Sequence, residues 1–270
     1  MKIFNGKKLA EKILTDLKNK IKKEKIKPRL AVIFVGNNRD SQLYIKNKKR
    51  AAQKIGLKIQ VFHFKKLLKE KKLVALIKKL NQDKSINGII VQLPLPKNLK
   101  SERIVKLILS YKDVDGFQKN SCFTPPLISA ISLALKKATH AYDRKKMVAL
   151  VNSDFFGQAV KNFFKKQGIK VNYLKRPFNQ QKLKLVKLAD ILISVCGCPD
   201  LIKGDMIKKG AILIDAGITV LPTKEVKGDV DAKSVIKKAS FLTPVPGGIG
   251  PLTVAFLLKN VYEAKKISNN

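Results

Sequence analysis

The chain has 270 residues, 45% of them hydrophobic, so it can bury a sizeable core and is long enough for two domains. Its 57 lysines and arginines against 19 aspartates and glutamates give a formal net charge of +38. Such a charge attracts nucleic-acid phosphates, but the excess is mainly lysine, is spread over both halves of the chain and is not interleaved with aromatic residues. The composition therefore carries no specific nucleic-acid signature, and a basic nucleic-acid-binding protein stays an open alternative.

Membrane, secretion and metal signals are weak in this sequence. No window reaches the uninterrupted apolar run of about 20 residues that spans a membrane, and the N-terminus lacks a signal-peptide core. Cys122, Cys196 and Cys198 are too few for a disulfide framework, and the last two lack zinc spacing. We expect a soluble protein of the reducing cytoplasm with buried, inert thiols, no bound metal and no membrane partner.

The first half of the chain alternates between two hydrophobic periodicities. An amphipathic helix is predicted over residues 7–25. Short apolar runs then alternate with helical patterns, the runs at 30–35, 58–64 and 86–91 and the helices at 39–55, 69–81 and 99–110. This alternation is typical of βαβ units around a parallel sheet.

Tyr44 and Lys48 are four residues apart in the predicted helix 39–55, so they project from the same face. A phenol and an amine could thus act on one substrate. The alternative is an ordinary solvated helix face, because the neighbouring residues are also basic.

Two polar loops follow later elements of this half. The run from Val91 to Pro96 ends the third strand in an extended, proline-rich loop at its carboxyl end, which is the edge where open α/β sheets bind ligands. Asp113-Val114-Asp115-Gly116 could join that edge, or could be an ordinary Asp/Gly turn.

The second half repeats the alternation after a helix over 125–137 and a polar segment over 138–146. Its predicted strands are 147–151, 169–174, 190–195 and 211–214, with helices at 157–166, 180–187 and 204–208. We place the domain boundary between 117 and 125. The predicted domains are 1–117, completed by a C-terminal helix over 251–270, and a nucleotide-binding domain over 118–250.

The first turn of the second half is the expected place for a dinucleotide pyrophosphate. Asn152-Ser153-Asp154 follows a strand and Gly157 opens a helix, but only one glycine of the usual fingerprint is present. Lys175 and Arg176, after the next strand, suit a ribose 2′-phosphate. An ordinary strand-turn-helix remains the alternative.

Three more loops are predicted in this half. Asp215 to Ile218 and Gly228 to Asp231 are expected at the sheet edge. The run from Thr243 to Thr253, with three prolines and three glycines, is expected to be a rigid non-helical loop suited to a flat ligand or to a hinge. A final helix is predicted from about Thr253.

Four motifs stand together in order: Tyr44-x-x-x-Lys48, Val91-Gln-Leu-Pro-Leu-Pro96, Lys112-Asp-Val-Asp-Gly-Phe117 and Pro244-x-Pro-Gly-Gly-x-Gly-Pro-x-Thr253. With them the chain resembles the bifunctional methylenetetrahydrofolate dehydrogenase/methenyltetrahydrofolate cyclohydrolase family over essentially its whole length. The resemblance implies an α/β fold of two domains built from βαβ units, the second a Rossmann-like parallel sheet, with a cleft between them.

The resemblance also implies two reactions and a partner. The first is oxidation of 5,10-methylenetetrahydrofolate with NADP, NAD being possible, and the second is hydrolysis of the methenyl product to 10-formyltetrahydrofolate. It further suggests a homodimer. By position, Lys48 would be the catalytic lysine, Tyr44 a ring-stacking phenol, Gln92 the group that orients the lysine, and Asp115 the carboxylate that grips the pterin.

The family's motifs carry over to further positions of this chain. The substrate-binding residues that the resemblance implies are Ser41, Tyr44, Leu93, Pro246, Gly247, Gly248 and Thr253. The cofactor-binding residues are Val151, Asn152, Ser153, Gly157, Lys175, Arg176 and Ile218. For Lys48 to act as an acid or base near neutral pH its pKa must be lowered, which burial and the cations of Lys46, Lys49 and Arg50 would favour.

Two segments depart from the family pattern. In the cofactor turn, Val151 replaces a glycine and Asp154 adds a negative charge, and both changes should weaken cofactor binding. The segment after Phe117 is short, and Leu127 replaces a glycine. A cyclohydrolase with a degraded cofactor site is therefore an alternative within the same family.

Overall fold

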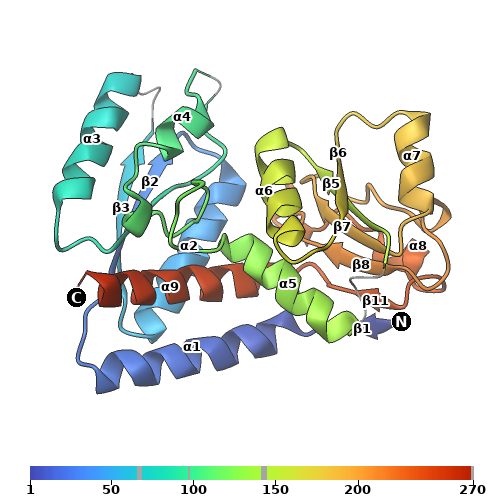
Figure 1. Ribbon diagram of the computed structural model, residues 1–270, viewed down its shortest axis with the longest axis horizontal. Helices are drawn as coiled ribbons and strands as arrows, with labels where there is room; N and C mark the ends of the chain where they lie inside the picture. The colour runs from blue at the N-terminus through green and yellow to red at the C-terminus, as the bar shows by residue number, and fades with distance from the viewer. Residues whose placement is uncertain (66–68, 97, 141–144, 269–270) are drawn as a thin grey trace. The chain divides into compact units, whose positions relative to one another are not determined.

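The computed structural model describes residues 1–65, 69–96, 98–140 and 145–268 (Figure 1). The chain divides into two compact units. We call residues 10–126 and 254–270 the three-stranded unit, and residues 1–9 and 127–253 the six-stranded unit. Part of the predicted polar segment 138–146, and the last two residues of the predicted C-terminal helix, lie outside the described residues.

The three-stranded unit is built around a parallel sheet of order β3-β2-β4. Its strands are β2 (Arg29–Val35), β3 (Lys58–Phe64) and β4 (Gly88–Val91). Its helical elements are α1 (Gly6–Lys23), α2 (Arg39–Lys54), α3 (Glu70–Gln82), α4 (Ser101–Val105), the 3-10 turn η1 (Ser110–Lys112) and most of α9 (Ile249–Ile267). Because the three strands are parallel, their carboxyl ends all lie at one edge of the sheet.

The central strand β2 is apolar at every position after Arg29 because both faces of the sheet are covered. Its alternate side chains enter two different cores. Leu30, Val32 and Phe34 pack with α1, α2 and α9, whereas Ala31 and Ile33 pack with α3 and α4. Helices on both sides therefore fix the register of the strand that leads into α2.

The six-stranded unit contains a parallel sheet of order β1-β11-β8-β7-β5-β6. Its strands are β1 (Lys2–Ile3), β5 (Met147–Val151), β6 (Val171–Lys175), β7 (Ile191–Val195), β8 (Ile212–Asp215) and β11 (Phe241–Leu242), and a separate antiparallel pair is formed by β9 (Thr219–Val220) and β10 (Val226–Lys227). Its helical elements are α5 (Pro126–Ala138), α6 (Asp154–Lys165), α7 (Gln180–Lys187), α8 (Ala232–Val235) and the 3-10 turn η2 (Gly204–Met206).

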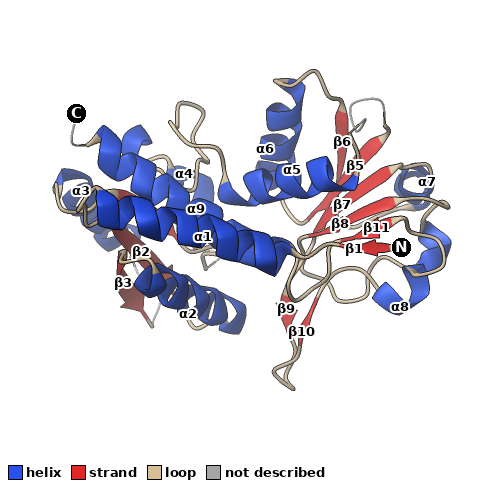
Figure 2. Cartoon of the chain, turned by 90° about the horizontal axis from the view of Figure 1, so that it is seen from below, coloured by secondary structure: helices blue, strands red, loops and turns tan. Residues whose placement is uncertain are grey.

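Helices cover both faces of this larger sheet. Val186 of α7 and Val235 of α8 lie in one core cluster with residues of β5, β7 and β8, and Figure 2 shows α5 and α6 on the opposite face. The chain crosses from β6 over β5 to β7, so the strand order reverses between β5 and β7. In doubly wound sheets the ligand lies outside the carboxyl ends of the strands at that reversal.

The structure confirms an α/β fold with two units and a parallel, Rossmann-like sheet in the second, while the predicted cleft stays a prediction. Residues 1–9 lie in the six-stranded unit, because β1 pairs in parallel with β11, whereas the predicted first domain, 1–117, includes them. A two-residue strand carries too little pattern to be recognised in the sequence.

Two predicted helices also differ in extent. The helix predicted over 99–110 is only the five-residue α4 followed by η1. The loop predicted from Thr243 to Thr253 ends early, since α9 already begins at Ile249. Pro251 is tolerated there because the amide groups of a first helical turn have no partner within the helix.

Candidate functional site

Helix α2 presents one buried stripe to the three-stranded unit. Its buried residues are Ser41, Ile45, Lys48 and Ala52, which recur at helical spacing. The helix starts at a side-chain cap, in which Asn38 Oδ1 accepts a hydrogen bond from the Ser41 amide at 2.8 Å. Lys48 is thus a polar residue within an apolar stripe, and only 7% of it is exposed.

The Lys48 ammonium is held by the residue that directly follows β4. Lys48 Nζ donates to Gln92 Oε1 at 2.9 Å, and Gln92 Nε2 donates to the Leu93 carbonyl at 3.0 Å. The Gln92 amide continues the sheet by donating to the Ile33 carbonyl at 2.8 Å. The Ser41 hydroxyl also donates to the Leu93 carbonyl, at 3.4 Å. Hydrogen bonds therefore bring together Lys48, Gln92, Leu93 and Ser41 in one cluster.

Burial lowers the pKa of Lys48, and the charge of Asp115 opposes that shift. The expectation that neighbouring cations also lower the Lys48 pKa was wrong. Lys46, Lys49 and Arg50 are exposed on the other faces of α2, and burial is the larger influence on the Lys48 pKa. A lysine with a lowered pKa gives up its proton more readily than an exposed lysine does, which suits an acid or base.

Asp115 lies on the loop that follows η1. Asp113 forms an isolated parallel bridge with Ile89 of β4, so the loop begins as a short extension of the sheet. Asp113 is fully buried and its Oδ2 accepts from the Gln118 amide at 2.9 Å, which anchors the loop. Gly116 has a left-handed backbone, with φ of 67°, and its amide donates to the Asp113 carbonyl. The segment is therefore an Asp/Gly turn that holds Asp115 in place.

The Asp115 carboxyl is half-buried and electrostatically coupled to the lysine. Burial raises the pKa of Asp115 to about 6, an effect that Lys48 opposes and Asp113 reinforces. Tyr44, one helical turn before Lys48, has a pKa raised above its usual value by burial and by the charge of Asp40. The phenol thus stays protonated at neutral pH and is able to donate a hydrogen bond or stack.

The remaining predicted substrate residues lie in the six-stranded unit. Pro246, Gly247 and Gly248 follow β11, and the Gly247 carbonyl accepts from the Lys7 amide at 2.9 Å. Gly247 has φ of 105°, and a Cβ on Gly248 would lie 2.5 Å from the Pro244 carbonyl oxygen, so both positions require glycine. The Thr253 hydroxyl donates to the Ile249 carbonyl within α9 at 3.1 Å.

The predicted cofactor residues follow three strands of the parallel sheet, β5, β6 and β8, and so share one edge of the sheet. Val151 ends β5, Lys175 ends β6 and Ile218 follows β8. Asn152 and Ser153 form the turn into α6, where Ser153 Oγ caps the helix by accepting from the Phe156 amide at 3.4 Å. Arg176 is exposed, and its amide donates to the Val151 carbonyl at 3.2 Å.

Gly157 has a packing role. A Cβ at this position would lie 2.4 Å from the Tyr173 ring, so only glycine lets α6 approach β6 this closely. This is the role of the third glycine in a dinucleotide fingerprint. The side chain of Val151 is completely buried in the sheet. Three features fit a dinucleotide: the start of helix α6, the basic residues at the end of β6, and the close packing of α6 on β6.

Two buried aspartates, whose roles the sequence did not reveal, organise this edge. Asp229 Oδ2 accepts from the Ser194 hydroxyl at 2.6 Å and the Cys196 amide at 2.7 Å, and its Oδ1 accepts from the Cys198 amide at 2.7 Å. The loop after β7 is thus tied to a residue more than 30 positions away. The repeated pairing of Asp with Gly was the available signal.

Asp215 is the second of these aspartates. It accepts from the amides of Gly217, Asp229 and Val230 at 2.9 to 3.1 Å. A Cβ on Gly217 would lie 2.0 Å from the Asp229 carboxyl carbon, and one on Gly228 would lie 2.1 Å from Asp215 Oδ2. Burial and the Asp229 charge raise the pKa of Asp215 to about 7. The Asp-x-Gly and Gly-Asp runs are therefore a backbone cage around two carboxyl groups.

The cysteines only partly match expectation. All three are free thiols, with Cys196 buried, Cys198 half-buried and Cys122 exposed, so the expectation that all are buried was wrong for Cys122. Within the described part of the chain, no cluster of three or more His, Cys, Asp or Glu side chains is arranged to hold a metal ion. Nor does any described helix have the length and apolarity to cross a membrane.

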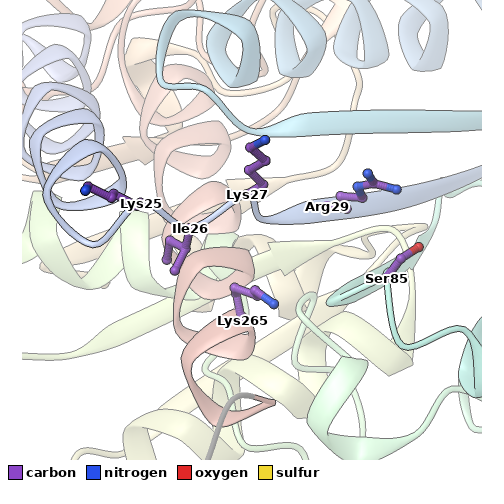
Figure 3. Close-up of a pocket in the computed structure, with 6 residues that line it drawn as sticks. All are labelled: Lys25, Ile26, Lys27, Arg29, Ser85 and Lys265. Carbon is purple, nitrogen blue, oxygen red and sulfur yellow. The ribbon is translucent and has the colours of Figure 1, made fainter.

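A shallow pocket of about 390 Å³ lies elsewhere in the three-stranded unit (Figure 3). It is lined by Lys25, Ile26, Lys27, Arg29, Ser85 and Lys265. Four of these six residues are cationic and none is a predicted site residue. The pocket reflects the lysine-rich surface and is separate from the cluster around Lys48.

Family models match both parts of the chain. Residues 4–115 match the catalytic domain of tetrahydrofolate dehydrogenase/cyclohydrolase, and residues 125–269 match its NAD(P)-binding domain. The chain belongs to the tetrahydrofolate dehydrogenase/cyclohydrolase family. This confirms the resemblance that the four sequence motifs indicated.

Relatives of the tetrahydrofolate dehydrogenase/cyclohydrolase family match along nearly the whole chain. The bifunctional protein FolD of Campylobacter jejuni is 37% identical over 98% of this chain and 99% of its own length. A crystal structure of the bifunctional enzyme FolD from Campylobacter jejuni has a TM-score of 0.89 at 36% identity, with 99% of both chains covered. The Trypanosoma brucei enzyme, solved with NADP and an inhibitor, has a TM-score of 0.90 at 28% identity, covering 99% of this chain and 98% of that one.

Proposed function

We propose that this protein oxidises 5,10-methylenetetrahydrofolate to the methenyl compound with NADP and hydrolyses that product to 10-formyltetrahydrofolate. The observation that carries the proposal is the buried Lys48, hydrogen-bonded to Gln92 and electrostatically coupled to Asp115, in a chain that belongs to the tetrahydrofolate dehydrogenase/cyclohydrolase family. The two activities are those named for the family in both matched domains.

For the hydrolytic step we assign the proton transfer to Lys48. Its lowered pKa favours the neutral amine, which can accept a proton from the attacking water and pass it to the ring nitrogen that leaves the former methenyl carbon. Gln92 Oε1 fixes the position of Nζ, so Gln92 is a positioning residue. Water adds to the methenyl carbon, and opening of the ring yields the formyl group.

Binding of the folate is assigned to the groups around the lysine. The two carboxylate oxygens of Asp115 suit paired N–H donors of a pterin. Tyr44 offers a protonated phenol for stacking, and Ser41 and Leu93 line the same cluster. Pro246, Gly247, Gly248 and Thr253 are also proposed as substrate-binding residues.

Bound NADP would supply the hydride acceptor for the oxidation of the methylene group of the substrate. The residues proposed to hold it are Ser153 and Asn152 at the start of α6, Lys175 and Arg176 after β6, and Ile218 after β8, with Val151 and Gly157 shaping the turn. The side chain of Val151 is buried in the sheet, which supports the view that this residue does not block the cofactor although it replaces a glycine.

A cofactor titration separates this proposal from its nearest alternative, a cyclohydrolase with a degraded cofactor site. NADP and NAD would be titrated against the purified protein by calorimetry. Saturable NADP binding supports the bifunctional enzyme. No saturable binding of either dinucleotide, together with retained methenyl hydrolysis, would favour the cyclohydrolase-only protein.

We further propose a homodimer in a reducing cytoplasm, which rests on the family and on the three free thiols. Sedimentation equilibrium would test the dimer.

The rival proposal of a nucleic-acid-binding protein rests on the +38 charge alone. Binding to RNA that disappears steeply with added salt would leave only the general charge effect.

A further inference from the structure

Asp154 and Lys175 form an ion pair at the edge of the six-stranded sheet. Asp154 lies in the first turn of α6, and Lys175 is the last residue of β6. The Lys175 ammonium donates to Asp154 Oδ2, and the two side chains are 48% and 58% exposed. This is one of the places where the chain departs from the family's cofactor turn.

Lys175 stands where a dinucleotide fold reads the adenosine ribose. β6 is the second strand of the nucleotide-binding alternation and lies next to β5, and the group at its carboxyl end faces the ribose hydroxyls or a 2′-phosphate. Lys182 Nζ fixes this corner by donating to the Lys175 and Pro177 carbonyls, both at 3.0 Å. Arg176, among the described residues, has no carboxylate within ion-pair distance.

We propose that Asp154 is a specificity-determining residue that lowers the preference for NADP over NAD by occupying the Lys175 ammonium. The proposal rests on the proposed dehydrogenase function. A 2′-phosphate has to displace Asp154 from Lys175 and then lies near its carboxylate, whereas the 2′-hydroxyl of NAD is uncharged and meets no such repulsion. The pair is exposed, so it contributes little stability and exchanges readily.

The expected effect follows from the charges. A carboxylate several ångströms from a phosphate with about two negative charges in a water-like medium weakens binding by about five- to tenfold. Neutralising Asp154 should therefore tighten binding of ligands that carry the 2′-phosphate more than binding of NAD, which meets the same carboxylate only through its diphosphate. This tighter binding should require the Lys175 ammonium, and should be lost when Lys175 is replaced as well.

The test compares Asp154→Asn with a matched control, Asp200→Asn. Asp200 also forms an ion pair in the same unit, half-buried, with Lys227 Nζ at 2.8 Å, so its replacement removes the same charge away from β6. NADP, NAD and 2′,5′-ADP are titrated by calorimetry at fixed salt, and circular dichroism melts check the fold. We expect Asp154→Asn to bind NADP and 2′,5′-ADP about five- to tenfold tighter with a smaller gain for NAD, and Asp200→Asn to match the unmodified chain.

Several outcomes would overturn the inference. These are an equal gain for NAD and NADP, the same gain in Asp200→Asn, or a gain that survives Lys175→Gln in the Asp154→Asn background. Absence of dinucleotide binding in both the unmodified chain and Asp154→Asn would also overturn it, and would remove the dehydrogenase activity as well. If Asp154→Asn does not fold, Asp154→Ser takes its place. Methenyl hydrolysis, measured on the same samples, reports separately on the cyclohydrolase.

Discussion

At the scale of single residues, the environment of Lys48 is the feature from which the proposed chemistry follows. A lysine on a buried helix stripe is costly unless its ammonium is paired, and here one amide oxygen and one nearby carboxyl supply that pairing. Because burial is the larger influence, the pKa is lowered and the neutral amine becomes accessible. The burial that makes the Lys48 ammonium costly thus also favours the neutral amine that the proposed proton transfer requires.

Replacing Lys48 with Met should abolish methenyl hydrolysis while the fold persists. The thioether fills a similar volume but cannot carry a proton, so we expect a loss of at least about 10²-fold in rate. Stopped-flow absorbance of the methenyl compound measures it. Lys49→Met, one residue along and exposed, is the control and should keep full activity. Substantial hydrolysis by Lys48→Met would remove the lysine from the mechanism.

Asp115 should give the cyclohydrolase an acid limb in its pH profile. Its pKa of about 6 means that below that pH the carboxyl becomes protonated and loses one acceptor for the pterin N–H donors. We expect kcat/KM to fall up to about tenfold per pH unit below pH about 6, since kcat/KM reports on the free enzyme. In Asp115→Asn this limb should disappear, along with most of the binding. An identical acid limb in that variant would assign it to another group.

The sequence identified this cluster through motifs, but could not explain its electrostatics. Tyr44 and Lys48 at helical spacing, with Gln92 and Asp115 after later elements, were recognisable together. Burial was expected to lower the lysine pKa, but the expected contribution of three neighbouring cations is not found, because they are exposed on other faces of α2. Which face is buried is decided by packing with residues far along the chain.

At the scale of elements, the loops that follow the parallel strands carry the proposed cofactor-binding residues. Parallel strands end at the same edge, so Ser153, Lys175 and Ile218 come together although they are distant in sequence. The alternation of strands and helices was predictable from periodicity. The two-residue strands β1 and β11 were not, because they depend on pairing with each other and with β8.

Gly157→Ala should destabilise the six-stranded unit. The added methyl group would meet the Tyr173 ring at 2.4 Å and force α6 away from β6, at an expected cost of about 1 to 3 kcal/mol. Urea unfolding followed by circular dichroism measures the change. Tyr173→Ala in the same chain removes the obstacle, so the double variant should lose less stability than the two single losses added together. Strict additivity would show that the ring does not impose the glycine.

At the scale of the whole molecule, buried carboxyl groups make the stability of the fold depend on pH. Burial raises the pKa of Asp113, and the pKa values of Asp115 and Asp215 are raised to about 6 and about 7. These groups hold protons in the folded protein that the unfolded chain releases above its ordinary carboxyl pKa. Their contribution to stability is thus complete in acid and is lost as the pH rises through the folded pKa values.

We therefore expect the melting temperature to fall between pH about 5 and pH about 7. Each group contributes up to about 1.4 kcal/mol per pH unit within its window, with partial cancellation expected from carboxyls of lowered pKa at the acid end. Scanning calorimetry at constant ionic strength measures it. Asp115→Asn removes one titrating group and should flatten the profile. A melting temperature that rises steadily across this range would contradict the assignment.

The central claim, that one chain oxidises and then hydrolyses a folate one-carbon unit, is tested most directly with the complete reaction. Purified protein is given 5,10-methylenetetrahydrofolate and NADP, and NADPH and 10-formyltetrahydrofolate are quantified over time. We predict that both form, saturably in NADP. Failure to form 10-formyltetrahydrofolate, even when the methenyl compound is supplied directly, would contradict the account.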